Sequence, residues 1–265
     1  MISLAGKVVF MAGAGSSAPG WSIGKATCVT LAKQGAYIVA LDSNFEAAKD
    51  ACFEIERVGG RALPVQADVG DEGSVAEAVR LAVVEFGGID IYIANAGIGK
   101  IGGLAETQRS DLVRIQQVNV ESLLITSKLV VPEMIKRGGG AIVAVSSVAG
   151  IRYVGYPHLA YSVTKAALIQ FARMIAQEYA DQGIRANTVI PGLIDTPRIH
   201  KNVAQAFSSE SDPKEVREKR SQQVPMRRMG TAWEVANAIA FLASDAASYI
   251  TGTELIVDGG LTGKY

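Results

Sequence analysis

Short runs of apolar, strand-forming residues alternate along the whole chain with longer segments whose apolar residues have helical spacing. Seven runs are typical of strands, at residues 7–11, 37–41, 62–66, 89–94, 141–145, 185–190 and 254–257. Several are apolar on both faces, which is typical of a parallel sheet that helices cover on both sides. The alternation therefore predicts the α/β class: a doubly wound seven-stranded parallel sheet with helices on both faces.

The composition supports one large domain and excludes several kinds of partner. No repeat, low-complexity tract or Pro/Gly linker divides the 265 residues, and 49% hydrophobic residues suffice for one buried core. With 26 basic and 26 acidic side chains the formal net charge is zero, so we expect neither nucleic acid nor a membrane as a partner. No apolar stretch approaches the roughly 20 residues of a membrane-spanning helix. Cys28 and Cys52 lie inside helical patterns and are expected to be core residues in a reducing, cytoplasmic environment.

The first predicted strand runs into a glycine-rich turn within the stretch VVFMAGAGSSAPGWSIGKAT, residues 8–27. Such a turn lets backbone N–H groups approach a pyrophosphate at the positive end of the following helix. Gly13, Gly15 and Gly24 suit that role. The alternative is a plain connection between a strand and a helix.

A carboxylate, Asp42, ends the second predicted strand in YIVALDSN. Asp42 lies about 20 residues beyond the loop. A carboxylate at that distance can accept hydrogen bonds from both hydroxyls of a ribose, and it would repel a 2′-phosphate. Together with the loop, Asp42 predicts a Rossmann-type dinucleotide site that takes NAD rather than NADP. Alternatively, Asp42 caps the helix that begins near Asn44.

A candidate reaction centre follows the fifth predicted strand. Tyr161 and Lys165 are four residues apart in a helical pattern, so both side chains project from one face. An ammonium group close to a phenol stabilises the phenolate, which suits proton exchange with a substrate. Ser146 and Ser147 end the strand, and a hydroxyl from either could reach the same substrate oxygen. Taken alone, a tyrosine and a lysine at this spacing also occur on ordinary exposed helices.

These features together resemble the short-chain dehydrogenase/reductase family in its single-domain form, nearly from end to end. The matching pieces are the glycine-rich loop at 13–24, Asp42, ADV at 67–69, ANAG at 94–97, VNV at 118–120, VSS at 145–147, YSVTK at 161–165, IRANTVIPG at 184–192 and DTP at 195–197. The resemblance implies one dinucleotide-binding catalytic domain over residues 1–265, with a substrate lid at about 195–225.

The resemblance also implies a role for each matched residue. Tyr161 would donate or accept the proton, and Lys165 would assist it and hold the nicotinamide ribose. Ser147 would orient the substrate oxygen, and Asn119 would hold a water molecule of the proton relay. Without the resemblance, Asn119 is an ordinary polar residue of a helix. The residues implied to bind NAD are Gly13, Gly15, Ser22, Ile23, Gly24, Asp42, Asp68, Val69, Asn95, Gly97, Tyr161, Lys165, Pro191, Gly192, Ile194 and Thr196.

The chain departs from the family pattern in three places. Residues 17–21 enlarge the glycine-rich loop, and Ser22 stands where the middle glycine is expected. We expect this extra segment to bulge over the adenosine half of the site, with Trp21 as a lid or as a surface anchor. Ala94 replaces the usual asparagine, and the interval from Ser147 to Tyr161 is slightly longer than usual.

The predicted substrate site has a mainly apolar and aromatic wall, which favours a medium-sized hydrophobic alcohol or ketone. This wall combines Val148, Ile151, Tyr153, Tyr156 and His158 with the lid between Arg198 and Val224. His158 is either a hydrogen-bonding group for the substrate or an ordinary loop histidine. The charged lid segment SSESDPKEVREKRSQQ predicts a mostly solvated helical face without a carboxylate-binding fork. Neither His200 nor a Cys/His cluster indicates a metal site.

The sequence favours NAD-dependent interconversion of a secondary alcohol and a ketone, by hydride transfer with Tyr161 as acid/base. Two alternatives are an NADPH-dependent 3-oxoacyl-type reductase, suggested by the stretch PMRRMGTAWEVANAIAFLASDAASYITGTELIVDGG, and a non-catalytic dinucleotide-binding protein. Asp42 argues against the first, and the intact catalytic residues argue against the second. An enoyl reductase is disfavoured because those relatives space the tyrosine and lysine more widely. The same C-terminal stretch resembles the subunit contacts of tetrameric family members, so we expect a homotetramer.

Overall fold

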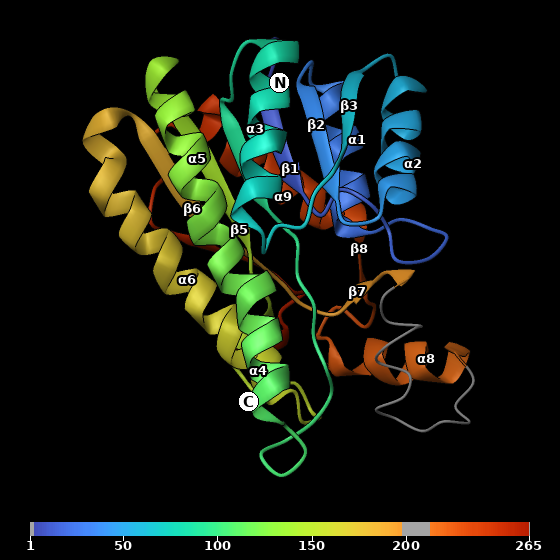
Figure 1. Ribbon diagram of the computed structural model, residues 1–265. Helices are drawn as coiled ribbons and strands as arrows, with labels where there is room; N and C mark the ends of the chain where they lie inside the picture. Colours follow the sequence, from blue (N-terminus) through green and yellow to red (C-terminus); the bar gives the residue numbers. More distant parts are fainter. Residues whose placement is uncertain (1–2, 198–212, 265) are drawn as a thin grey trace.

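The computed structural model describes residues 3–197 and 213–264, and it contains one seven-stranded parallel sheet (Figure 1). From edge to edge the strands are β3 (Arg61–Gln66), β2 (Tyr37–Asp42), β1 (Val8–Ala12), β4 (Ile91–Ala94), β5 (Gly140–Val145), β6 (Ile184–Pro191) and β9 (Glu254–Val257). All seven predicted strands are confirmed, with ends shifted by at most two residues. The strand order reverses between β1 and β4, and the loops at the carboxyl ends of the strands therefore diverge there and leave a crevice.

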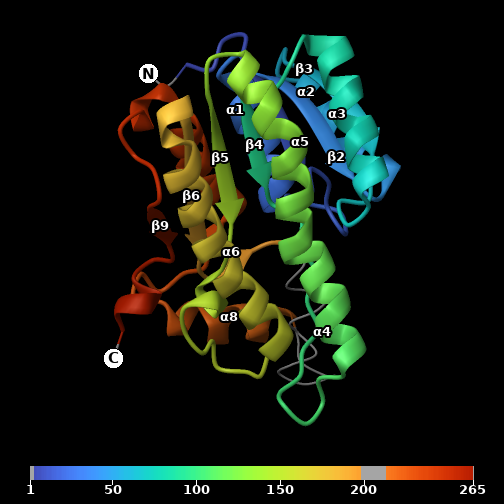
Figure 2. The ribbon, with the colours of Figure 1, turned by 60° about the vertical axis from the view of Figure 1, so that its left-hand side comes forward.

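Helices cover both faces of the sheet, as predicted (Figures 1 and 2). One face carries α1 (Ile23–Lys33), α2 (Phe45–Glu56) and α9 (Ala232–Ala243), and the other carries α3 (Glu72–Phe86), α5 (Ser122–Lys136) and α6 (Leu159–Tyr179). In β1, Val8 and Phe10 belong to the core on the α3 side, whereas Val9 and Met11 belong to the core on the α1 side. Burial on both faces explains why β1 and β4 are continuously apolar. None of the described helices is long and apolar enough to cross a membrane.

Smaller elements gather beyond the carboxyl ends of the strands, at the lower end of the molecule in Figures 1 and 2. Here lie α4 (Arg109–Gln116), which continues through the π-helical turn η1 (Gln117–Glu121) into α5, the short parallel pair β7 (Ile194–Asp195) and β8 (Gly230–Thr231), and α8 (Pro213–Gln223). Four 3₁₀ turns complete the elements of the described residues: η2 (Val148–Gly150), η3 (Ala180–Gln182), η5 (Asp245–Ala247) and η6 (Leu261–Gly263). The predicted lid includes α8, whereas its residues 198–212, with His200, lie outside the described residues.

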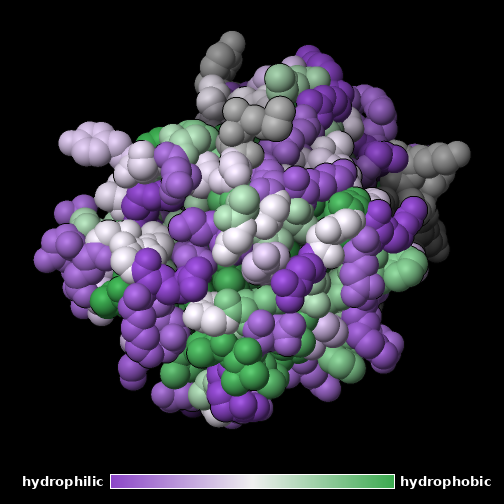
Figure 3. Space-filling model, turned by 90° about the horizontal axis from the view of Figure 1, so that it is seen from above, coloured by the Kyte–Doolittle hydropathy of each residue, from purple (hydrophilic) through white to green (hydrophobic). Residues whose placement is uncertain are grey.

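The amino ends of the strands form the opposite end of the molecule, which Figure 3 shows from above. Hydrophilic residues cover much of this face, and hydrophobic residues lie in small groups between them. A hollow of about 620 Å³ lies here. Its charged groups have partners within the fold, because Arg137 Nε donates to Asp90 at 2.8 Å and Arg185 donates to the Leu242 carbonyl at 2.8 Å. These charged groups are therefore engaged in holding the fold together at this end of the sheet.

The two cysteines are core residues, as predicted. Cys28 is fully buried and Cys52 is 4% exposed, both in the core between the sheet and α1, α2 and α9. Burial raises the pKa of Cys52 to about 12, and it also raises the pKa of Cys28. Both thiols therefore stay protonated at neutral pH and act as small apolar side chains.

Candidate active site

Two connected hollows lie at the carboxyl ends of the strands, a cleft of about 510 Å³ and a cavity of about 150 Å³. Ile23, Asn95 and Thr196 line both of them, so the two are continuous. The cleft is also lined by Gly13, Gly15, Ser22, Gly24, Asp42, Asp68, Val69 and Gly97, and the cavity by Ser147, Tyr161, Lys165, Pro191, Gly192 and Ile194. The structure thus brings every predicted site residue except Asn119 to the wall of one continuous groove.

The glycine-rich loop allows three backbone segments to pack against one another. Gly13 has a φ of +77°, and a Cβ there would lie 2.8 Å from the backbone of Ala96. A Cβ at Gly24 would lie 2.0 Å from the Gly13 carbonyl oxygen, which also accepts a hydrogen bond of 2.7 Å from Asn95 Nδ2. The end of β1, the end of β4 and the start of α1 therefore meet too closely for any side chain at these two glycines.

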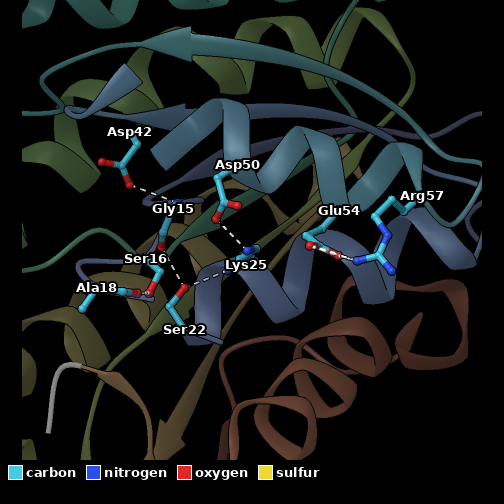
Figure 4. Close-up of polar contacts among 9 residues, drawn as sticks. All are labelled: Gly15, Ser16, Ala18, Ser22, Lys25, Asp42, Asp50, Glu54 and Arg57. Carbon is cyan, nitrogen blue, oxygen red and sulfur yellow. Dashed lines mark hydrogen bonds and ion pairs between the residues drawn. The ribbon is translucent and has the colours of Figure 1, made fainter. Parts of the chain in front are cut away.

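Ser22, which stands where a glycine was expected, caps α1. Its hydroxyl accepts from the Lys25 N–H at 3.0 Å and donates to the Gly15 carbonyl at 2.7 Å (Figure 4). The first turn of α1 contains no acidic residue, so the positive end of the helix faces the cleft without compensation from its own side chains. This end of the cleft can therefore hold an anion such as a pyrophosphate.

The extra segment 17–21 is anchored to the body of the molecule. The Trp21 ring packs on Trp233 of α9, with centroids 4.6 Å apart, and Lys25 Nζ lies 4.9 Å from the Trp21 centroid. Beside Trp21, a Cβ at Gly20 would lie 3.0 Å from Pro197 Cγ. Of the two alternatives for Trp21, these contacts support the anchor. The segment approaches Pro197, and its expected position over the adenosine half of the site stays a prediction.

This anchor makes a prediction about stability. Trp233→Leu is expected to lower the free energy of unfolding by about 1 kcal/mol, because it removes the aromatic pair. Chemical denaturation would measure the change. Phe53→Leu removes an exposed aromatic ring, 59% exposed, and serves as the control. An equal loss in both variants would contradict the anchoring role of the pair.

Asp42 is the last residue of β2, and both of its carboxylate oxygens accept backbone hydrogen bonds. Oδ2 accepts from the Gly15 N–H at 3.0 Å (Figure 4). Oδ1 accepts from the Asn44 N–H, also at 3.0 Å. The alternative that Asp42 caps the next helix is wrong, because Asn44 is the N-cap of α2 and accepts from the Glu46 N–H. The Asp42 carboxylate is thus fixed at the wall of the cleft.

Tyr161 and Lys165 lie in the first turns of α6, beside the end of β5. Lys165 is only 3% exposed, its Nζ donates to the Val145 carbonyl at 2.7 Å, and it lies 5.6 Å from the centre of the Tyr161 ring. Ser146 Oγ donates to the Lys165 carbonyl at 2.7 Å, which ties the strand to the helix. Ser147 Oγ accepts from the Ala149 N–H at 3.2 Å and lines the cavity. The predicted pair and the strand-end serine therefore share one cavity.

Asn119 lies behind this cavity, in the π-helical turn between α4 and α5. Its Oδ1 accepts from the Ile98 N–H at 2.8 Å, and its Nδ2 donates to the Ile98 carbonyl and to Thr164 Oγ1, both at 2.9 Å. The whole carboxamide is engaged in joining the loop after β4 to α6. The predicted role of holding a water molecule stays a prediction.

The cavity wall differs from the expected one. Val148, Tyr156 and His158 line the cavity, whereas Ile151 and Tyr153 do not and are 40% and 70% exposed. The His158 ring stacks on Tyr161, with centroids 4.5 Å apart and an interplanar angle of 16°. This histidine is therefore part of the site and contacts the candidate acid/base directly.

Arg220 of α8 is a site residue that sequence reasoning missed. It is 4% exposed and lines the cavity, although its neighbours in the sequence, such as Lys219, lie on an exposed helical face. Burial lowers the pKa of its guanidinium, and a hydrogen bond with Tyr156 partly offsets that effect. The highly charged sequence around Arg220 gave no sign that one of these charges is buried.

Metal ligation finds no support in the described part of the chain. Within residues 3–197 and 213–264, no group of three or more His, Cys, Asp or Glu side chains could hold a metal ion.

Comparison with known proteins adds family relationships to this geometry. The sequence model of a family described as Enoyl-(Acyl carrier protein) reductase matches residues 17–262. Over 257 residues the chain is 36% identical to 2,5-dichloro-2,5-cyclohexadiene-1,4-diol dehydrogenase LinX of Sphingobium indicum, covering 97% of this chain and 96% of the relative. Over 258 residues it is 36% identical to 3-oxoacyl-(acyl-carrier-protein) reductase FabG of Thermotoga maritima, covering 97% of this chain and 98% of the relative.

Solved structures with the same fold are also similar in sequence. A short-chain type dehydrogenase/reductase from Mycobacterium marinum has a TM-score of 0.89 and 30% identity, over 99% of this chain and 98% of that one. L-Sorbose reductase from Gluconobacter frateurii, complexed with NADPH and L-sorbose, has a TM-score of 0.91 and 30% identity. The match covers 100% of this chain and 99% of that one.

Proposed function

The chain belongs to the short-chain dehydrogenase/reductase family, and from this membership we propose that it is an NAD(H)-dependent oxidoreductase of secondary alcohols and ketones. The observation that carries the proposal is the meeting of Ser147, Tyr161 and Lys165 in a cavity continuous with the glycine-lined cleft. The names of two relatives, a diol dehydrogenase and a sugar reductase, also describe chemistry between hydroxyl and carbonyl groups.

The cleft fits a nicotinamide dinucleotide because glycines line it at positions where a side chain would fill the space. A Cβ at Gly15 would lie 2.5 Å from the Cβ of Ala47, so only glycine keeps this part of the cleft free. Gly13 and the start of α1 would hold the pyrophosphate, Asp42 the adenosine ribose, and Thr196 the nicotinamide end. When bound, the cofactor supplies or accepts the hydride.

The residues of the cavity would handle the proton. Tyr161 would accept the hydroxyl proton of an alcohol at its phenol oxygen, or donate that proton to a ketone oxygen. The ammonium of Lys165 would stabilise the phenolate between these steps, from a position fixed by the Val145 carbonyl. Ser147 already accepts from Ala149 N–H, so its own hydrogen is available to orient the substrate oxygen.

Asp42 is the group that favours NAD in this proposal. In the described part of the chain, Arg114 is the only cation that lines the cleft, and its guanidinium lies 3.7 Å from Asp68. A 2′-phosphate beside Asp42 would therefore meet a carboxylate and no unengaged cation. This argues against the NADPH-dependent 3-oxoacyl-type reductase, although one relative carries that name and one similar structure holds NADPH.

A charge-removing substitution tests this preference. Asp42→Asn keeps an acceptor for the Gly15 N–H but removes the negative charge. We expect the dissociation constant of NADPH, divided by that of NADH, to fall by about 10- to 100-fold. A change of this size corresponds to the loss of a hydrogen bond to a charged group. Cofactor fluorescence titrations would measure it. Glu46→Gln, in the first turn of α2 and outside the cleft lining, is the control. An unchanged ratio in Asp42→Asn would assign the preference elsewhere.

The cavity also bears on substrate size. Its volume of about 150 Å³ is well below the roughly 300–1,000 Å³ of sites for drug-sized ligands. Val148, Val154 and Leu193 would contact the hydrocarbon part of the substrate. These observations favour a compact substrate over the medium-sized one expected from the sequence.

Turnover separates the proposed enzyme from a non-catalytic dinucleotide-binding protein. NAD⁺ incubated with a panel of small secondary alcohols is expected to be reduced to NADH, read by absorbance. Absence of hydride transfer from all of them, with NADH binding intact, would favour the non-catalytic alternative. The expected homotetramer stays a prediction, and light scattering would test it.

A further inference from the structure

A buried cation lies at the wall of the cavity that holds the candidate catalytic residues. Arg220 lines this cavity together with Ser147 and Tyr161, and only 4% of its surface is exposed. Its Nε is buried without a hydrogen-bond partner in the parts of the chain that the structure describes. The guanidinium forms a hydrogen bond with Tyr156.

This arrangement leaves the cation poorly compensated. Moving a guanidinium out of water is costly unless an anion or several acceptors replace the lost hydration. Among the described residues that line the cavity, no acidic side chain occurs, and Val148, Val154 and Leu193 add apolar surface. On the same helix, exposed Arg217 forms an ion pair with Asp195. The buried arginine thus lacks the kind of partner that the exposed one has.

We propose that Arg220 binds a carboxylate of the substrate, and that the enzyme acts on compact hydroxy acids and oxo acids. This inference rests on the proposed oxidoreductase function, because it names the substrate class of the same cavity. Arginine binds carboxylates through charge-assisted N–H donors, and a carboxylate in the cavity would supply the anion that the buried guanidinium lacks.

The proposed reaction leaves the carboxylate unchanged. In the oxidative direction, the C–H bond of the alcohol carbon breaks and its hydride goes to NAD⁺. The hydroxyl proton goes to the Tyr161 phenolate, and the O–H electron pair forms the C=O bond of the oxo acid. One NADH forms for each alcohol oxidised, and the reduction of the oxo acid is the reverse.

Matched pairs of acids and esters test this assignment. The probes are lactate, 3-hydroxybutyrate and 4-hydroxypentanoate, each in both enantiomers, with their methyl esters. NADH formation gives kcat/KM, and calorimetric titration of the NADH-loaded protein gives the affinity for each acid. The wild-type protein is expected to use and bind at least one acid about 100-fold better than its ester, because the ester cannot pair with a buried charge.

Arg220→Gln identifies the group responsible. This variant is expected to lose about 100-fold in kcat/KM for the acid, mainly through KM, with little change for the ester. Arg220→Lys, which keeps the charge, is expected to recover part of the loss. Lys219→Gln removes an exposed charge from the same helix and is the matched control. NADH binding by each variant shows that the cofactor cleft has folded.

The outcomes separate this inference from the proposed function. Acid binding that depends on Arg220, without any reduction of NAD⁺, would support the carboxylate site and contradict the oxidoreductase. Equal turnover of acids and esters, unaffected by Arg220→Gln, would overturn the carboxylate site and leave the oxidoreductase standing. If the protein neither binds nor oxidises any acid of the panel, the carboxylate site is overturned.

Discussion

Replacing Tyr161 with phenylalanine is expected to lower kcat by about 10²- to 10⁴-fold, the usual contribution of a positioned acid or base. The change removes one oxygen atom and keeps the ring, so the stacking on His158, at 4.5 Å between centroids, should persist. NADH affinity should therefore change little. Steady-state kinetics with any alcohol that the wild-type protein oxidises, together with an NADH titration, would measure both quantities.

The exposed Tyr153 provides the matched control. It lies outside the cavity lining and is 70% exposed, so Tyr153→Phe should leave kcat unchanged. Turnover near the wild-type rate in Tyr161→Phe would show that another group moves the proton. Loss of NADH binding in the same variant would show that the ring, and not the hydroxyl, had been disturbed.

Adding one methyl group at Gly24 is expected to have the second large effect. A Cβ there would lie 2.0 Å from the Gly13 carbonyl oxygen and 2.8 Å from Asn95 Nδ2, and neither of these groups is free to move away. Gly24→Ala should therefore lower the free energy of unfolding by about 3 kcal/mol through overpacking. It should also weaken NADH binding by about 100-fold, because the start of α1 must shift.

The control for this substitution is a glycine with room around it. Gly73 lies in the first turn of α3, and a Cβ there would lie 3.5 Å from Asp71 Oδ1, an ordinary contact. Gly73→Ala should leave NADH affinity unchanged and raise stability by up to about 1 kcal/mol, since alanine favours the helix. A Gly24→Ala protein as stable as this control would contradict the close packing described for the loop.

The elements and the main site residues were predictable because their signals are local. Short runs rich in strand-forming residues located all seven strands, and the ends of these runs located the loops that form the cleft and the cavity. The spacing of Tyr161 and Lys165 placed both on one helical face, and the end of β5 placed Ser147 beside them. In each case the period of a strand or helix determines the position.

Other features were not predictable, because they depend on contacts between distant segments. Trp21 meets Trp233 only when α1 and α9 pack side by side, and nothing near either residue signals the pair. Asn119 lies in a π-helical turn, which differs from an α-helix by its hydrogen bonds and has no residue pattern here.

Arg220 shows the same limit for a charge. Its sequence neighbours are charged as well, and only the packing of α8 over the cavity buries this one side chain. The composition of a helical segment indicates the average exposure of its side chains. Whether one particular cation is buried depends on where the helix packs.

Parallel titration of the purified protein with NADH and NADPH, followed by cofactor fluorescence, tests the central claim most directly and requires no knowledge of the substrate. We expect micromolar binding of NADH and NADPH binding at least about 10-fold weaker, because in the proposed function the loop holds a pyrophosphate and Asp42 selects the ribose without a 2′-phosphate. Binding of neither cofactor, or tighter binding of NADPH, would contradict it.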